Sequence, residues 1–174
     1  MTKSEAIQKL NEAFSAVEML INSIPEEQFF HKPANSKWSV AENVEHLFLS
    51  VKPLVGLFGK KDMMLANWGK SGRASGTYDE LVSTYLERLS KLPSGVAFGP
   101  VAPVAITGSK DEIIGKLNSI HEKFTERTEA LTEEELDTYQ VPHPLLGLLT
   151  GREFVYFTAY HTVHHHKAIL NIVS

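Results

Sequence analysis

The sequence predicts an all-α domain built from four or five major helices, and three observations lead to this prediction. Five times, a Ser or Thr is followed three residues later by Glu and then by apolar residues at helical spacing. In such a capping box the hydroxyl and the carboxylate satisfy free N–H groups of the first helical turn. No segment forms a convincing β-hairpin, and long irregular segments separate the helical ones. We therefore expect antiparallel neighbouring helices, at least one long crossover and a β content close to nil.

The capping boxes mark where most of the helices begin. They are Thr2/Glu5, Ser39/Glu42, Ser109/Glu112, Thr132/Glu135 and Thr150/Glu153. The first helix is expected over about 4–23, ending before Pro25. The second starts after Ser39. Because Pro53 within it lacks an N–H group, a kink or an early end is expected there.

Farther along, helical segments alternate with irregular ones. The segment 59–77 shows no lasting helical or strand period, so we interpret it as a long connection. The remaining elements are a helix over 78–92, an irregular crossing over 93–108, a helix over 110–131, a helical turn near 133–137, a loop over 141–149 and a last helix from Arg152 almost to the C-terminus. The length of 174 residues suits one domain spanning 1–174.

The composition excludes several classes of function. With 17 Lys and Arg against 21 Asp and Glu, the net charge is −4, which disfavours nucleic acid as a partner. The absence of cysteine rules out disulfides, thiolate metal sites and cysteine nucleophiles. The sequence shows neither a secretory signal nor a long apolar run, so we expect a cytoplasmic protein without a membrane partner. Histidines, carboxylates and hydroxyls remain as candidates for chemistry.

The last helix carries the main chemical signal, because four of the eight histidines fall within YHTVHHHKAIL, residues 160–170. Its inward face is predicted from spacings of three and four as Phe154, Thr158, His161, His165, Ala168 and Ile172. His161 and His165 are one turn apart on the same side, close enough to chelate one metal ion. His164 and His166 are rotated off this face and either flank the site or face solvent.

A tight divalent site needs a third ligand from another helix. The candidates are His31, His46, His121, His143, Glu42 and Glu45. His46 lies beside the apolar stripe of the second helix, from which it can reach the core. The alternative is that His161 and His165 are core histidines, hydrogen-bonded to carboxylates or carbonyls of neighbouring helices.

Three short motifs follow one another in a defined order. They are W-S-x-x-E-x-x-x-H over 38–46, H-P-L-L-G-x-L-T over 143–150 and A-Y-H-x-x-x-H over 159–165. Together they resemble the DinB/YfiT-like superfamily of metal-dependent enzymes. The resemblance implies a four-helix bundle with up-down-down-up topology, often dimeric, in which His46, His161 and His165 hold one divalent ion. Members commonly have Gln three residues after the last histidine, where this chain has Ala168.

Three imidazoles leave at least one position of an ion open for water or substrate, as in catalytic sites. Zn, Ni, Fe and Mn all accept imidazole ligands. Glu42, one turn before His46, is the candidate general base or partner of a ligand, and helix capping is its alternative role. The resemblance suggests a hydrolase, or a transferase that activates a small thiol such as bacillithiol, mycothiol or glutathione, acting on a small molecule as a homodimer.

The sequence also allows two other interpretations of the function. The bundle can bind a metal or a small ligand without catalysis, or its histidines can serve only for packing within an oligomer. The roles of His143, His164 and His166 and the identity of the substrate do not follow from the sequence.

Overall fold

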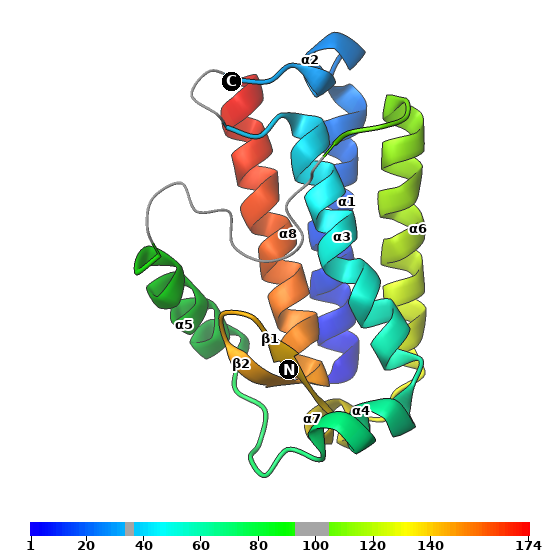
Figure 1. Ribbon diagram of the computed structural model, residues 1–174, viewed down its shortest axis with the longest axis vertical. Coiled ribbons are helices and arrows are strands. Elements are labelled where there is room, and N and C mark those ends of the chain that lie inside the picture. The colour runs from blue at the N-terminus through cyan, green and yellow to red at the C-terminus, as the bar shows by residue number, and fades with distance from the viewer. Residues whose placement is uncertain (34–36, 93–104) are drawn as a thin grey trace.

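The computed structural model describes residues 1–33, 37–92 and 105–174, and its framework is a bundle of four long helices (Figure 1). These are α1 (Lys3–Ser23), α3 (Val40–Phe58), α6 (Lys110–Glu129) and α8 (Gly151–Val173). In Figure 1, α1 and α8 run upward while α3 and α6 run downward. The predicted helical fold class and the up-down-down-up topology are therefore confirmed.

The pairing of the bundle helices differs from the prediction. Helix α1 packs most extensively against α8, and α3 packs most extensively against α6, and both pairs run parallel. The antiparallel pairs, α3 with α8 and α1 with α6, share smaller contacts. The expectation of antiparallel neighbours is thus wrong for the two largest helix interfaces. Parallel packing of α3 and α6 is possible because a long connection rather than a short turn joins them in sequence.

The helix starts follow the sequence closely. All five predicted capping boxes are formed, at the starts of α1, α3, α6, α7 (Glu133–Thr138) and α8. A further capping box, Thr77 with Glu80, starts α5 (Tyr78–Ser90) and was not identified from the sequence, although it has the same spacing. Each box contributes about 1 kcal/mol to its helix.

Pro53 does not end its helix. It lies inside α3, which continues to Phe58. Val51 and Leu54, on either side of the proline, are buried in the core together with Phe58. Burying an aliphatic or aromatic side chain contributes about 1.5–3 kcal/mol, which is enough to offset one lost helical hydrogen bond. The predicted early end is therefore wrong.

The segment 59–77, predicted to be irregular, contains a helix, α4 (Lys61–Trp68). Met64 of this helix is buried in the core. The Nζ atom of Lys61 lies 2.7 Å from Oε1 of Glu135 in α7. Tertiary contacts therefore hold α4, and a helix held in this way carries no long apolar period in its sequence.

Between α1 and α3 the chain forms one short additional helix. A short helix, α2 (Glu26–Phe30), was not predicted and buries Phe29 against the core. Most of the predicted irregular crossing over 93–108 lies outside the described residues. In the described part of the chain, none of the helices combines the length and the apolar character that crossing a membrane requires.

The predicted loop over 141–149 forms a β-hairpin, so the expectation of almost no β structure and no hairpin is wrong. Strand β1 (Gln140–His143) pairs antiparallel with β2 (Gly147–Thr150), with His143 opposite Gly147. Gly147 has a φ of 79°, a left-handed conformation that favours glycine. The hairpin escapes detection because its apolar residues and prolines do not alternate with polar ones.

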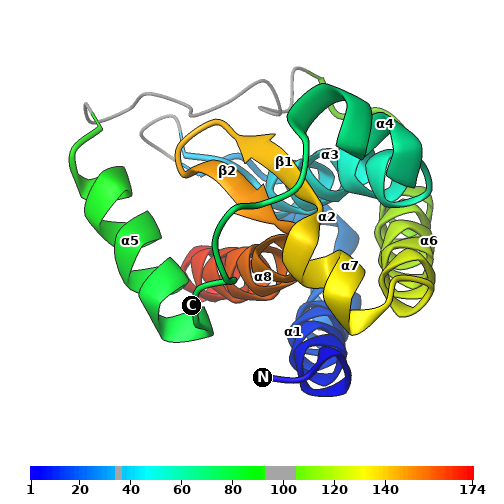
Figure 2. The same ribbon diagram turned by 90° about the horizontal axis from the view of Figure 1, so that it is seen from below.

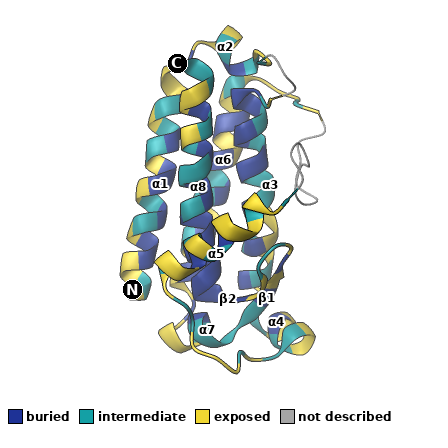
Figure 3. Ribbon diagram, turned by 90° about the vertical axis from the view of Figure 1, so that its left-hand side faces the viewer, coloured by how far each residue is buried: buried dark blue, intermediate teal, exposed yellow. Residues whose placement is uncertain are grey.

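The elements outside the bundle cover one side of α8. Seen from below in Figure 2, α5 lies on the side of α8 that faces away from α6, and the hairpin lies beside α3. Figure 3 shows α5 largely exposed on its outer side, whereas the first half of α8 is buried. Helices α3, α5 and α8 and the hairpin thus surround one volume, and His161, His164 and His165 of α8 line it.

Candidate metal centre

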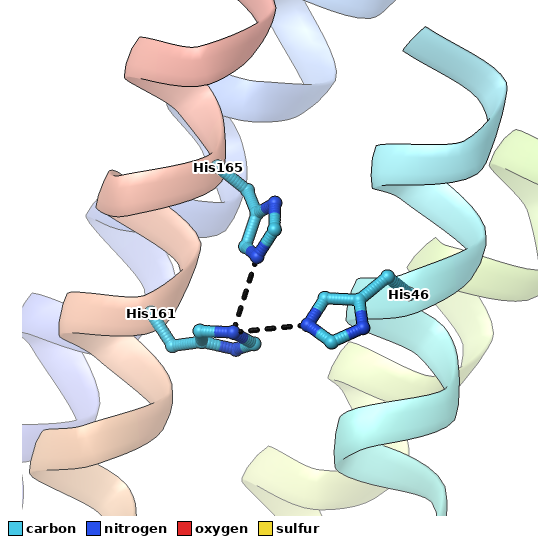
Figure 4. A group of neighbouring side chains, drawn as sticks. All are labelled: His46, His161 and His165. Carbon is cyan, nitrogen blue, oxygen red and sulfur yellow. Dashed lines mark hydrogen bonds between the residues drawn. The ribbon is translucent and has the colours of Figure 1, made fainter. Parts of the chain in front are cut away.

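Three histidines from two helices meet inside the bundle. His46 comes from α3, and His161 and His165 come from α8, with their rings pointing toward one another (Figure 4). Nε2 of His161 lies 3.1 Å from Nε2 of His46 and 3.1 Å from Nε2 of His165. Each of the three residues is only 6% exposed. We call these three residues the histidine cluster.

The helix geometry explains why these residues meet. His161 and His165 are one turn apart on α8 and therefore project to the same side. Helix α3 runs antiparallel to α8 and contacts it. It presents His46 beside its buried residues Val44 and Leu47. The predicted pair and the predicted third histidine are thus brought together.

The spacing of the cluster suits one metal ion. Nitrogen ligands at the usual zinc distance of about 2.0–2.1 Å, arranged tetrahedrally, lie about 3.3 Å apart. The two 3.1 Å separations are close to that value, and one ligand atom from each residue lies within 4.8 Å of the others. Among the described residues, the hydrogen-bond partners of His161 are the two other imidazoles rather than a carboxylate or a carbonyl.

Asn43 of α3 orients one of the three imidazoles. Its Nδ2 donates to the carbonyl of Ser39 at 2.8 Å, which fixes the amide so that Oδ1 faces His165. This oxygen lies 2.7 Å from Nδ1 of His165. Because an amide oxygen only accepts, Nδ1 of His165 carries the proton. Its Nε2 therefore presents a lone pair to the cluster, as a metal ligand must.

Burial keeps His161 and His165 uncharged. Removal from water lowers the pKa of His161 well below its usual value, and the neighbouring His165 and His46 lower it further. Burial likewise lowers the pKa of His165 well below the usual value, assisted by His46 and His164. Protons therefore do not compete for these nitrogens at neutral pH. The donor set is buried and convergent, and two of its members are neutral, which fits a divalent ion.

Aromatic rings hold the imidazoles in place. The Phe157 ring stacks on His161 with a centroid distance of 5.1 Å and an interplanar angle of 17°. The Trp38 ring lies 4.9 Å from His46 and 6.1 Å from His165, measured between centroids. These contacts restrict ring rotation and so preorganise the three nitrogens.

The histidine cluster borders a pocket of about 710 Å³. Helices α3, α5 and α8 and the hairpin contribute its walls. Most of the lining is apolar and includes Leu54, Leu57, Leu89, Val141, Phe154 and Phe157. A pocket of this volume, lined by apolar groups with a few polar ones, suits a small-molecule ligand. The face of the cluster that borders the pocket is where such a ligand would approach an ion.

Glu42 does not join the cluster. One oxygen accepts from the backbone N–H of Ser39 at 2.7 Å, as part of the capping box, and the other accepts from Nζ of Lys32 at 2.9 Å. Burial alone raises the pKa of this carboxyl group, but the hydrogen bonds from Lys32 and Ser39 outweigh that effect and hold the pKa below its usual value. The structure thus gives Glu42 the capping role that was its alternative.

The other candidate ligands also lie outside the cluster. His31 and Glu45 are not among its members, and His31 is exposed. His121 is half-buried, stacks on Phe14 with a centroid distance of 4.2 Å, and its Nε2 lies 2.8 Å from Oδ1 of Asn11. Neither His31 nor His121 lines the pocket.

His143, His164 and Ala168 do line the pocket. His143 is buried in the hairpin, whereas His164 and His166 are half-buried on α8. Burial and the charge of Lys167 lower the pKa of His164. The predicted placement of His164 beside the site is therefore correct.

Sequence reasoning missed Asn43 and Trp38. A signal for Asn43 was present, since it precedes His46 by three residues and so lies on the same face of α3. The position of Trp38, outside any helix, depends on how the chain enters α3 and has no comparable signal. The contribution of α5 to the pocket depends on tertiary packing.

Comparison with known proteins adds a family and a fold. A family model described as the DinB superfamily matches residues 9–169. A search of curated protein sequences returns no match. The family match includes all three members of the histidine cluster.

Solved structures match nearly the whole chain. TT2238, a four-helix bundle protein, has a TM-score of 0.63 and 15% identity over 98% of this chain and 99% of its own. YfiT from Bacillus subtilis, described as a probable metal-dependent hydrolase with an unusual four-helix bundle topology, has a TM-score of 0.61 and 19% identity over 98% of this chain and 85% of its own. The colibactin self-resistance protein ClbS, solved in complex with double-stranded DNA, has a TM-score of 0.62 and 15% identity over 99% of this chain and 96% of its own. These similarities establish a shared fold.

Proposed function

The chain belongs to the DinB superfamily, and on that basis we propose that it is a metal-dependent enzyme acting on a small molecule, with His46, His161 and His165 as the metal ligands. The reaction is either hydrolysis or the transfer of a group to a small thiol. The observation that carries the proposal is the convergence of three buried imidazoles at the wall of an apolar pocket. The description of YfiT as a probable metal-dependent hydrolase supports the same class of activity.

In this proposal the residues of the site have different roles. A divalent ion, Zn, Ni, Fe or Mn, supplies Lewis acidity that activates water, a thiol or a carbonyl group. His46, His161 and His165 hold the ion, and Asn43 keeps His165 in the tautomer that binds it. Phe157 and the other apolar residues of the pocket exclude water and bind the apolar part of a substrate. Glu42 serves the start of α3 rather than the reaction.

A second candidate function is the binding of a metal or small ligand without catalysis. One observation favours it: no Asp or Glu is among the described residues that line the pocket, so no carboxylate is in position to act as a general base. The Ala168 side chain, at the position where family members commonly carry Gln, offers no polar group either.

Several expectations from the sequence complete the proposal. We expect one domain over 1–174, a homodimer, a cytoplasmic location and no nucleic-acid partner. ClbS shows that a protein with this fold can bind double-stranded DNA. The net charge of −4 does not favour such binding by this chain.

The first test is the metal content of protein purified without a histidine-affinity step, together with His46→Ala and His161→Ala. We expect about one equivalent of a divalent metal in the wild type and its loss in both variants, because two histidines do not hold an ion tightly. Exposed His31 provides the matched control, and His31→Ala is expected to keep the metal. Failure of the wild type to bind Zn, Ni, Mn or Fe(II) would contradict the metal site.

Catalysis is tested separately on the metal-loaded protein with ester and amide substrates and with small-thiol acceptors. We expect turnover that disappears after dialysis against EDTA and returns when the metal is restored. Activity that persists in metal-free protein would contradict the mechanism. Silence across the panel, with metal binding retained, would favour the binding protein over the enzyme.

A further inference from the structure

His143 is the last residue of β1 and forms part of the pocket wall. It is not a member of the histidine cluster. It is 8% exposed and lines the pocket. Its ring centroid lies 4.3 Å from that of Phe157, and the Phe157 centroid lies 5.1 Å from that of His161. A small molecule in the pocket is therefore able to contact His143 and the histidine cluster at the same time.

The hairpin turn fixes the tautomer of His143. Its Nδ1 accepts hydrogen bonds from the backbone N–H groups of Leu145 and Leu146, at 3.1 Å each. An imidazole nitrogen that accepts cannot carry a proton, so the proton of the neutral ring is on Nε2. Nη1 of Arg88 donates to the carbonyl of Leu145 at 2.7 Å and anchors the same turn to α5. The ring therefore presents an N–H group at a defined place.

This N–H group is open to the pocket. Among the described residues, every side-chain nitrogen or oxygen that is sealed from solvent has a hydrogen-bond partner. The hydrogen bonds of His143 within the described chain both use Nδ1. Nε2 is thus not sealed from solvent, and because His143 lines the pocket, we infer that a ligand atom there accepts its proton in a hydrogen bond.

His143 stays neutral at physiological pH. Burial, assisted by the charge of Arg88, lowers its pKa to about 4. A neutral imidazole with a fixed tautomer donates a hydrogen bond without giving up its proton, which suits it to hold an oxygen acceptor.

The electrostatics of the pocket favour a negatively charged ligand. The described lining contains Lys37 and five histidines but no carboxylate. An anion entering this apolar pocket therefore meets donors and a positive charge without a competing carboxylate.

We propose that His143 is a ligand-positioning residue whose Nε2–H group donates to a carboxylate oxygen of a small ligand with an apolar body. The apolar body packs against Phe154, Phe157 and Leu89. The proposal concerns the same pocket as the proposed function and names its class of ligand, but it rests on His143 and does not require the metal.

The test compares two probes that differ in charge, 4-phenylbutyrate and 4-phenylbutan-1-ol, by calorimetry on EDTA-treated protein. We expect the wild type to bind the acid at least tenfold more tightly than the alcohol, since hydrogen bonds to charged groups are the stronger ones. In His143→Phe this preference disappears while the affinity for the alcohol is kept. His143→Gln, which retains an N–H donor, keeps the preference. A preference that survives in His143→Phe, or that is lost in both variants, overturns the proposal.

A second measurement does not depend on any variant. Nitrogen-15 NMR of the wild-type imidazoles is expected to show His143 protonated on Nε2, with this signal shifting when 4-phenylbutyrate is added. Protonation on Nδ1, or a signal indifferent to the acid, overturns the proposal. Metal content is measured in parallel, and His143→Phe is expected to keep its equivalent of metal. Failure of the metal site and failure of the His143 contact are thereby distinguished.

Discussion

Helix α8 buries polar side chains at two places, and the two differ in how their charges are balanced. At its start, Nε of Arg152 lies 2.6 Å from Oδ1 of Asp137, and a second carboxylate, Glu133, pairs with the same guanidinium. The next residue, Glu153, pairs with Arg73 at 2.6 Å. Every charge in this ionic cluster therefore faces an opposite charge from another segment.

Two to three turns farther along, the histidine cluster is arranged differently. His161 faces the two other imidazoles, His165 also faces Asn43, and burial lowers the pKa of both His161 and His165 well below the usual value. The ionic cluster is complete within the chain and joins α7 and the 71–76 segment to α8. The histidine cluster gathers lone pairs that a cation would complete. A buried set of polar groups whose charges are balanced within the chain has a structural role. A buried set that a bound ion would complete indicates a functional site.

The largest expected effect is on the pH dependence of stability, and it contrasts the ionic cluster with His143, which lies in the pocket wall near the histidine cluster. In the folded protein the pKa of His143 is lowered from 6.5 to about 4. The contribution of His143 to the free energy of unfolding is therefore fully present above pH 6.5. It is lost as the pH falls toward 4, because the unfolded chain takes up the proton first. For His143 alone this amounts to about 3 kcal/mol. Urea unfolding of metal-free protein between pH 7.5 and 4 measures it.

The ionic cluster is expected to respond in a lower window. Hydrogen bonding from Arg152 holds the pKa of Asp137 below its usual 3.8, so its contribution is present above that pH and is lost only below it. His143→Phe should reduce the dependence between pH 6.5 and 4 and leave the share that comes from His161 and His165, whereas the exposed His31→Gln should leave it unchanged. An unaltered slope in His143→Phe would show that His143 is not the titrating group.

Removal of Arg152 tests the ionic cluster directly. Arg152→Met leaves Asp137 and Glu133 without their partner, and we expect the free energy of unfolding to fall by about 2–3 kcal/mol. The value lies below that for fully buried pairs because both carboxylates are partly exposed. Lys91→Met, in an exposed pair with Glu87, is the control and should cost less than about 0.5 kcal/mol. Metal affinity should not change in either variant, and a loss with Arg152→Met would mean that the regions are coupled.

The smallest expected effect comes from Asn43, which orients a ligand without being one. Asn43→Ala should weaken metal binding ten- to hundredfold, or about 1–3 kcal/mol, because His165 is no longer held in its binding tautomer. Competition with a chelator measures the affinity. Asn43→Asp, which retains the acceptor, should preserve it. Equal affinity in Asn43→Ala and wild type would remove Asn43 from the site.

Local signals made much of this molecule predictable. A capping box requires only a hydroxyl and a Glu three residues later, so all five predicted boxes were correct and the box at Thr77 was detectable too. The pairing of His161 with His165 follows from helix phase, and their approach to His46 agrees with the family resemblance.

Other features depend on packing between distant segments. Helix α4 forms around buried Met64, and the hairpin depends on a turn completed by Gly147 and by the amides that His143 accepts. Glu42 was a candidate general base or partner of a ligand, but Lys32 and Ser39 donate hydrogen bonds to its two carboxylate oxygens. Such competition for hydrogen bonds is decided in three dimensions and leaves no periodicity in the sequence.

The position of Trp38 gives the site an optical signal of its own. The chain has two tryptophans, and the second, Trp68, ends α4 at the far end of α3 (Figure 1). The indole of Trp38 lies 4.9 Å from His46, within the range over which an open-shell ion such as Co²⁺ or Ni²⁺ quenches fluorescence. A Trp68→Phe protein would therefore emit only from beside the cluster. Metal binding would then be monitored as a decrease in the fluorescence of Trp38, with no added dye.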